Sequence, residues 1–157
     1  MPGLEDLYRE IILDHYRNPR NRGELPVPPA HRVEGFNPLC GDEVVIYLEV
    51  DGDKVSDVRI DGQGCSISQS SASMMSAAVK GKTVDEARAM TRAFKAMMSI
   101  HESSLDGGDG DVIEADPDVK LGDLEALRGV VKFPVRIKCA TLSWNTLTQG
   151  LDEAESA

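Results

Sequence analysis

Aromatic residues, basic charge and long apolar runs are all scarce in this chain. Only 4% of its 157 residues are aromatic, and 17 Lys and Arg stand against 27 Asp and Glu, which gives a net charge of −10. No basic stripe is present, which argues against binding to nucleic acid or to an anionic membrane surface. No apolar run approaches the roughly 18 residues that a membrane span requires. The sequence therefore predicts neither a nucleic-acid partner nor membrane association.

Cysteine is also scarce, and no secretory signal is visible at the start of the sequence. The chain has three cysteines, and its first residues lack a basic region followed by an apolar core. Three cysteines cannot all pair within one chain, so the count favours free or metal-bound thiols in a reducing cytoplasm. Three buried, inert cysteines remain the alternative, because free Cys is among the residue types most often buried.

The hydrophobic pattern predicts a small antiparallel meander within one domain. A chain of this length is sufficient to bury one core, and we expect residues 1–157 to form a single domain. Strand periodicity over 44–50 and 55–60 flanks residues 51–53, whose Asp-Gly pair predicts a hairpin. Residues 31–36 supply the candidate third strand.

Helical periodicity dominates the remaining sequence. Apolar residues spaced by three and four predict one helix from Leu4 that ends at Asn18-Pro19, and others over 67–78 and 84–98. A capping box at residues 83–86 opens the third of these helices. A short helix is expected over 123–129, and a last helix begins between Pro134 and Ala140 and runs to Leu151.

Acidic residues and glycine dominate residues 102–118. Seven Asp or Glu and three Gly occur there without a Lys or Arg, which predicts a mobile, solvated loop. A calcium loop is the alternative, but the run 106–111 lacks the spacing and the terminal glutamate of an EF-hand. Residues 152–157 are expected to form a frayed tail.

The cysteines carry the chemistry that the sequence suggests. Cys65 and Cys139 are both expected near helix starts, where unpaired N–H groups and partial positive charge favour thiolate over thiol. Arg136 and Lys138 would add positive charge beside Cys139, although a surface position is the alternative for Lys138. Thiolate sulfur is both a metal ligand and a nucleophile.

Three thiolates and one carboxylate would fill the tetrahedral shell of a zinc ion. The carboxylate is Asp42, which lies with Cys40 in a turn-like stretch. A thiolate-rich set favours zinc or iron over magnesium or calcium. The Cys-x-Asp spacing is not a usual paired-cysteine motif, so the pattern alone leaves the site open. A single His on a helix face, such as His15, is more often packed or capping than ligating.

Three motifs resemble the IscU/NifU-N superfamily of iron–sulfur cluster scaffold proteins. They are residues 37–42 (NPLCGD), 62–68 (GQGCSIS) and 133–140 (FPVRIKCA), and the opening segment LYREIILDHYRNP also fits. Within the superfamily the chain is most similar to the SufU branch. Lys138 stands where typical IscU scaffolds carry His, and an extra segment ending at residues 121–127 separates the second and third cysteines.

The resemblance implies a compact α+β domain, with a three-stranded antiparallel sheet packed against several helices. It implies one zinc ion bound by Cys40, Asp42, Cys65 and Cys139. We expect this zinc to hold the fold together, because it joins a sheet-side loop to two helices that share only modest core contact.

The resemblance also implies partners and an activity. The implied partner is the pyridoxal-phosphate-dependent, SufS-like cysteine desulfurase of the SUF system. The implied activity is that of a sulfurtransferase: the protein would accept the persulfide sulfur of this enzyme and deliver it to a downstream cluster-assembly complex. Cys40 is the expected acceptor, because it lies in a Pro/Gly loop that can move. Two alternatives stay open: a scaffold that assembles an iron–sulfur cluster on the same ligands, and a structural zinc protein without sulfur chemistry. Lys138 in place of His argues against the scaffold.

Overall fold

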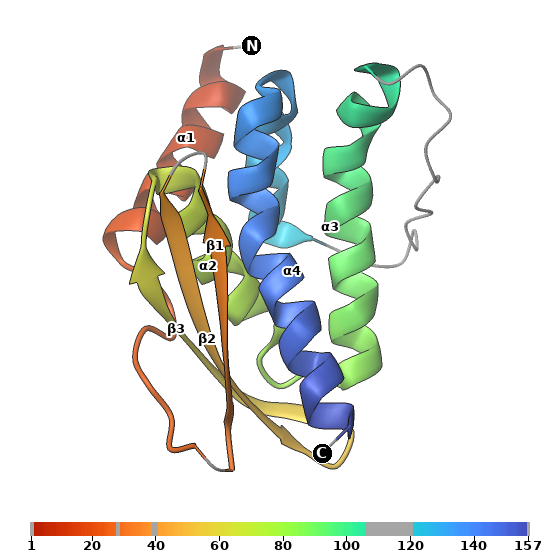
Figure 1. The fold of residues 1–157 in the computed structure, drawn as a ribbon. Helices are drawn as coiled ribbons and strands as arrows, with labels where there is room; N and C mark the ends of the chain where they lie inside the picture. Colours follow the sequence, from red (N-terminus) through yellow and green to blue (C-terminus); the bar gives the residue numbers. More distant parts are fainter. Residues whose placement is uncertain (1, 28, 39–40, 106–120, 157) are drawn as a thin grey trace.

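The computed structural model describes residues 2–27, 29–38, 41–105 and 121–156. Its elements follow the chain in the order α1 (Pro2–Arg17), β1 (His31–Asn37), β2 (Asp42–Asp51), β3 (Lys54–Gln63), α2 (Ser66–Val79), α3 (Val84–Leu105), a 3₁₀ helix η1 (Gly122–Lys132) and α4 (Pro134–Ser156) (Figure 1). The sequence-based expectation of an α+β chain with three strands and several helices is confirmed.

The three strands form an antiparallel meander in the order β1-β2-β3, as the hairpin pattern predicted. Asn37 at the end of β1 pairs with Asp42 at the start of β2, and Glu43 pairs with Gln63 at the end of β3. This register brings three strand ends to one end of the sheet. The motif residues that adjoin those ends are therefore neighbours in space.

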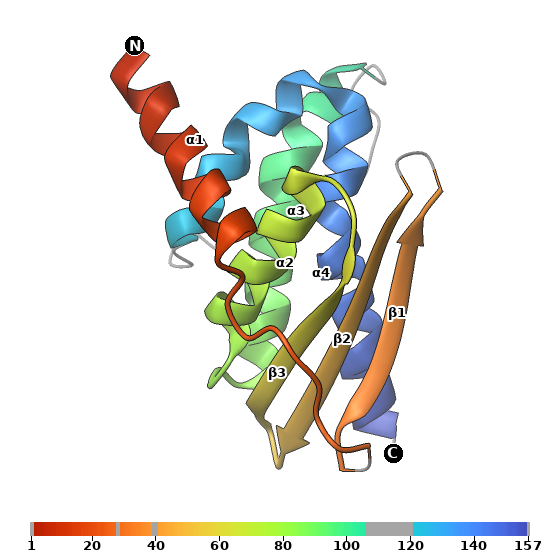
Figure 2. The same ribbon diagram turned by 90° about the vertical axis from the view of Figure 1, so that its left-hand side faces the viewer.

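The helices gather on one face of the sheet (Figures 1 and 2). α4 packs against β1 and β2, α2 packs against β3, and α3 lies beyond them against α4 and η1. A single hydrophobic cluster runs through these elements and includes Trp144 of α4, which stacks on Phe94 of α3 with ring centroids 5.1 Å apart. Met74, Met75 and Met98 are buried in the cluster, as expected for core filler. None of the helices in the described segments is both long and apolar enough to cross a bilayer.

α2 and α4 are in direct contact, which corrects the expectation that the two cysteine-bearing helices share little. The hydroxyl of Ser71 donates a hydrogen bond of 2.5 Å to the backbone carbonyl of Ala140. Serine and alanine on the facing surfaces allow the two helix backbones to approach closely. The core therefore joins these helices without help from a metal ion.

The capping box predicted at the start of α3 is present. The Glu86 N–H donates to Thr83 Oγ1, and Glu86 Oε1 accepts from the Thr83 N–H, both at 3.0 Å. The hydrogen bond from the Thr83 backbone lowers the pKa of Glu86 below its usual value. The reciprocal pair satisfies two N–H groups that the first helical turn leaves unpaired.

His15 is packed rather than exposed, and it ties three elements together. Its side chain is buried between Ser73 of α2, whose Oγ is 2.8 Å from Nδ1, and Asp123 of η1, whose Oδ2 is 3.0 Å from Nε2. Because a carboxylate oxygen can only accept, the contact with Asp123 is a hydrogen bond that Nε2 donates. Ser73 Oγ also accepts a hydrogen bond from the Arg20 N–H. This chain of hydrogen bonds fixes α1 and η1 against α2.

Three expectations about loops and ends need correction. The tail from residue 152 is not frayed, because α4 continues to Ser156 and Arg88 pairs with Asp152 at 2.9 Å and Glu155 at 3.2 Å. Residues 102–105 of the expected acidic loop belong to α3, and 106–120, with the calcium alternative, lie outside the described residues. The short helix at 123–129 is a longer 3₁₀ helix, η1.

Candidate metal centre

Cys65 is the N-cap of α2, as the change of period predicted. Its backbone is extended, with φ −70° and ψ 165°, and its Sγ accepts a hydrogen bond from the Ser68 N–H at 3.4 Å. The side chain is half-buried. As the N-cap, its sulfur faces the unpaired N–H groups at the start of the helix.

Asp42 lies at the start of β2 with its side chain fully buried. Its Oδ1 accepts a hydrogen bond of 2.8 Å from the Cys65 backbone N–H, and its Oδ2 lies 3.8 Å from Cys65 Sγ. One oxygen is thus occupied by the backbone that leads into α2. The other is directed to the sulfur, in the position of a ligand atom.

Gly64 makes the close approach of these two segments possible. A Cβ built on Gly64 would lie 2.5 Å from Asp42 Oδ1 and 3.0 Å from Asp42 Cα. Any larger residue would separate the end of β3 from the start of β2. Glycine therefore stands before Cys65 because a side chain at this position would collide with Asp42.

Cys139 is the sixth residue of α4, because the helix begins at Pro134. It therefore lies beyond the first turn, which holds the unpaired N–H groups of the helix. The stabilisation of a thiolate that was expected from a position at the helix start does not apply to Cys139. The nearest positive charge is Arg136, whose Nη1 is 3.9 Å from Cys139 Sγ, whereas Lys138 is exposed. Cys139 itself is completely buried.

Asp42, Cys65 and Cys139 form one cluster in the described part of the chain. Their ligand atoms all lie within 4.8 Å of one another. Zinc bonds of about 2.3 Å to sulfur and about 2.0–2.2 Å to oxygen would place neighbouring ligand atoms roughly 3.5–3.8 Å apart. Two thiolates and a carboxylate at these separations fit a zinc ion with little movement. Cys40, the fourth residue expected, lies outside the described residues.

Asn37 also belongs to the site, although no role for it was predicted from the sequence. Its buried side chain places Nδ2 3.4 Å from Asp42 Oδ2 and 3.6 Å from Cys139 Sγ. The β1–β2 register places Asn37 opposite Asp42, and α4 brings Cys139 to both. The amide thus provides N–H groups to two ligand atoms, a contact that orients metal ligands. Its place at the start of the first motif was the only signal in the sequence.

Replacing Asn37 by Leu should weaken metal binding without unfolding the chain. The change keeps the number and branching of the side-chain heavy atoms but removes the N–H groups near Asp42 and Cys139, and we expect zinc affinity to fall by about 10- to 100-fold. Competition with a chromogenic chelator measures the dissociation constant. Asn18→Leu is the matched control, because Asn18 also donates to a carboxylate, that of Asp14, but on the exposed end of α1. Equal affinities for the two variants would contradict a role for Asn37.

Comparison with known proteins finds relatives that match nearly the whole chain. The family model described as the NifU-like N-terminal domain matches residues 7–140. The chain is 46% identical over 152 residues to a Bacillus subtilis protein named zinc-dependent sulfurtransferase SufU, covering 97% of this chain and 94% of that protein. It is 37% identical to a Streptococcus pyogenes protein named iron–sulfur cluster assembly scaffold protein IscU, covering 98% and 88%.

Solved structures show the same fold. A Fervidobacterium islandicum protein described as an iron–sulfur cluster assembly scaffold for the SUF system superposes with a TM-score of 0.75 at 38% identity, covering 90% of this chain and 94% of that one. A NifU-like N-terminal protein from Brucella abortus superposes with a TM-score of 0.78 at 25% identity, covering 98% and 97%. The family match, the identities and the shared fold lead to one conclusion: the chain belongs to the NifU-like N-terminal domain family and is SufU/IscU-like, as its three motifs predicted.

Proposed function

We propose that this chain is a zinc-dependent sulfur-transfer protein for iron–sulfur cluster assembly. It would accept persulfide sulfur from a SufS-like cysteine desulfurase and pass it to a downstream SUF assembly complex. The observation that carries the proposal is the cluster of Asp42, Cys65 and Cys139, whose ligand atoms lie within 4.8 Å. The identity of 46% to a protein named zinc-dependent sulfurtransferase supports it.

We assign Cys40 as the fourth zinc ligand, with Asp42, Cys65 and Cys139. Only Gly41 separates Cys40 from Asp42 in the sequence, so their Cα atoms lie within about 7.6 Å of each other. A thiolate at that distance along the chain is within reach of an ion held by the other three. Zinc, when bound, would keep the thiolates deprotonated and protect them from oxidation.

Cys40 is the best candidate for the sulfur acceptor. The Cys40 thiolate would attack the outer sulfur of the partner's persulfide, forming a new S–S bond on Cys40 while the partner's own sulfur leaves as a thiolate. The other two sulfurs are held in place: Cys65 caps α2 and Cys139 is buried within α4. In the sequence, Cys40 falls between the last residue of β1 and the first residue of β2.

Mass spectrometry locates the transferred sulfur. After incubation of the zinc-loaded protein with desulfurase and cysteine, we expect one added sulfur atom on the peptide that contains Cys40. The variant Cys40→Ser should accept none, while Asn18→Leu, remote from the site, should behave as wild type. Sulfur found only on Cys65 or Cys139 would refute the assignment of Cys40.

A cluster scaffold on the same ligands is the second candidate. The relative named IscU, at 37% identity, favours it, and so does the solved structure described as a SUF-system scaffold. Purified protein that carries iron and sulfide, with visible absorption, would support this function over sulfur transfer. A colourless zinc protein that raises desulfurase turnover would support sulfur transfer. A zinc protein with no effect on turnover would be structural only.

A further inference from the structure

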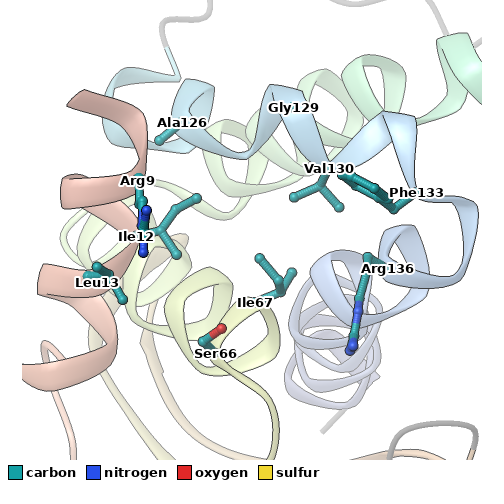
Figure 3. A pocket seen from close by; sticks show the side chains of 10 residues that line it. All are labelled: Arg9, Ile12, Leu13, Ser66, Ile67, Ala126, Gly129, Val130, Phe133 and Arg136. Atoms are coloured by element: carbon teal, nitrogen blue, oxygen red, sulfur yellow. The ribbon is translucent and has the colours of Figure 1, made fainter. Parts of the chain in front are cut away.

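A pocket of about 560 Å³ opens beside the metal centre (Figure 3). α1 contributes one wall, the first turn of α2 contributes another, and η1 and the start of α4 complete it. Its apolar lining includes Ile12, Ile67, Val130 and Phe133. The hydrogen bonds of His15 to α2 and η1 hold these walls together. The pocket is therefore built by long-range contacts and not by one loop.

The pocket adjoins the metal centre without containing any of its ligands. Ile67 is two residues after Cys65, and Arg136, at the α4 end of the pocket, places Nη1 3.9 Å from Cys139 Sγ. A molecule seated in the pocket would thus lie next to the reactive sulfurs. It would leave Asp42, Cys65 and Cys139 free to hold a metal ion.

The two arginines stand at opposite ends of the pocket (Figure 3). Arg9 is exposed and forms no ion pair with any residue that the structure describes, whereas Arg20, Arg22 and Arg128 on nearby elements each pair with a carboxylate. On a chain with a net charge of −10, Arg9 therefore offers a guanidinium at the rim of the pocket that no described carboxylate neutralises. Burying it against a carboxylate would give a favourable, directional contact.

The apolar surface continues from the pocket into solvent. Phe133 is 62% exposed and Val135, two residues further, is 58% exposed. A small metabolite would fill the pocket and leave this surface wet. A protein segment would cover the pocket and the exposed residues together, which is the usual arrangement at an interface.

We propose that this pocket anchors the persulfide-bearing partner through an apolar side chain flanked by a carboxylate that pairs with Arg9. The assignment rests on the proposed function, because it identifies the occupant as the desulfurase. An acidic segment is repelled by most of this acidic chain and attracted to Arg9 and Arg136. The charge pattern therefore orients the partner so that its persulfide approaches the metal centre.

Charge reversal tests the anchor. Arg9→Glu should raise the dissociation constant for the cysteine desulfurase of the same organism by about 10-fold or more, because a carboxylate would then face a carboxylate. Arg17→Glu is the matched control: Arg17 is exposed on the same helix, has no ion pair in the described chain, and lies outside the pocket. The wild-type dissociation constant should rise with salt concentration, and that of Arg9→Glu should rise less.

A second pair of variants tests the apolar part. Phe133→Ser should weaken binding to the desulfurase by about 10-fold, as expected for an aromatic residue at an interface. Val27→Ser is the control, because Val27 is similarly exposed but does not line the pocket, and it should leave the affinity unchanged.

The anchor would be overturned if each variant bound the desulfurase as tightly as its control. Sulfur transfer to Cys40 would then still stand, because it does not depend on the anchor. If the wild type self-associates and Arg9→Glu abolishes that association, a second copy of this chain occupies the pocket, and the anchor for the desulfurase is overturned too. No binding of wild-type protein to desulfurase would overturn both proposals.

Discussion

Removal of zinc should lower the melting temperature of the protein by about 8–16 °C when free zinc had been 1,000-fold above its dissociation constant. A ligand that binds only the folded state adds about 4.1 kcal/mol at that excess. Each kcal/mol corresponds to about 2–4 °C for a domain of this size. The shift should grow with the logarithm of free zinc.

The same structure limits the size of that shift. α2 and α4 already pack together, with Ser71 hydrogen-bonded to the carbonyl of Ala140. Trp144 and Leu147 of α4 are fully buried in a hydrophobic cluster that contains none of the three metal-centre residues. We therefore expect the metal-free protein to unfold cooperatively at a lower temperature, unlike small zinc domains, which are unfolded without metal.

Calorimetry with and without chelator measures the effect. Cys65→Ser should remove most of the zinc-dependent shift, because it loses a thiolate ligand, while Arg17→Glu should retain it. An unchanged melting temperature on chelation would mean that zinc binds weakly or elsewhere. Loss of any cooperative transition would mean that the metal, and not the core, holds the helices together.

Local periodicity was sufficient to predict most of the fold. The alternation around the Asp-Gly turn predicted β2 and β3, and the capping box predicted the start of α3 within one residue. The errors concern distant contacts. The end of α4 is held by Arg88, which is 64 residues from Asp152 in the sequence, so no local pattern could predict that residues 152–156 are helical.

In the candidate site, too, the residue types could be predicted from the sequence, whereas the distant contacts could not. The residue types Asp42, Cys65 and Cys139 suggested a metal centre, and the resemblance grouped them. The role of Asn37 depends on strand register and on the approach of α4, since its amide is 102 residues from Cys139. The pocket was not predicted at all. Its walls come from four elements, and a buried hydrogen bond from His15 to a residue 108 positions away helps to fix them.

Gly64→Ala should reduce zinc affinity by about 10- to 100-fold while leaving the chain folded. Its added Cβ would lie 2.5 Å from Asp42 Oδ1, which is closer than real Cβ contacts come, and 3.0 Å from Asp42 Cα, which is tighter than most of them. The Cα belongs to the backbone of β2 and cannot rotate away, so the strand end must shift. The shift would break the hydrogen bond from the Cys65 N–H to Oδ1 and turn Oδ2 away from the sulfurs.

Gly129→Ala is the matched control, because a Cβ there would meet no atom within 4 Å. Chelator competition should give it wild-type zinc affinity, and its melting temperature without zinc should be unchanged. For Gly64→Ala the loss should appear mainly in the zinc-dependent part of the melting temperature, since the strained contact involves a ligand and not the core. Equal zinc affinity for the two variants would mean that Asp42 is not held by the contact with residue 64, and the geometry assigned to the metal centre would then be wrong.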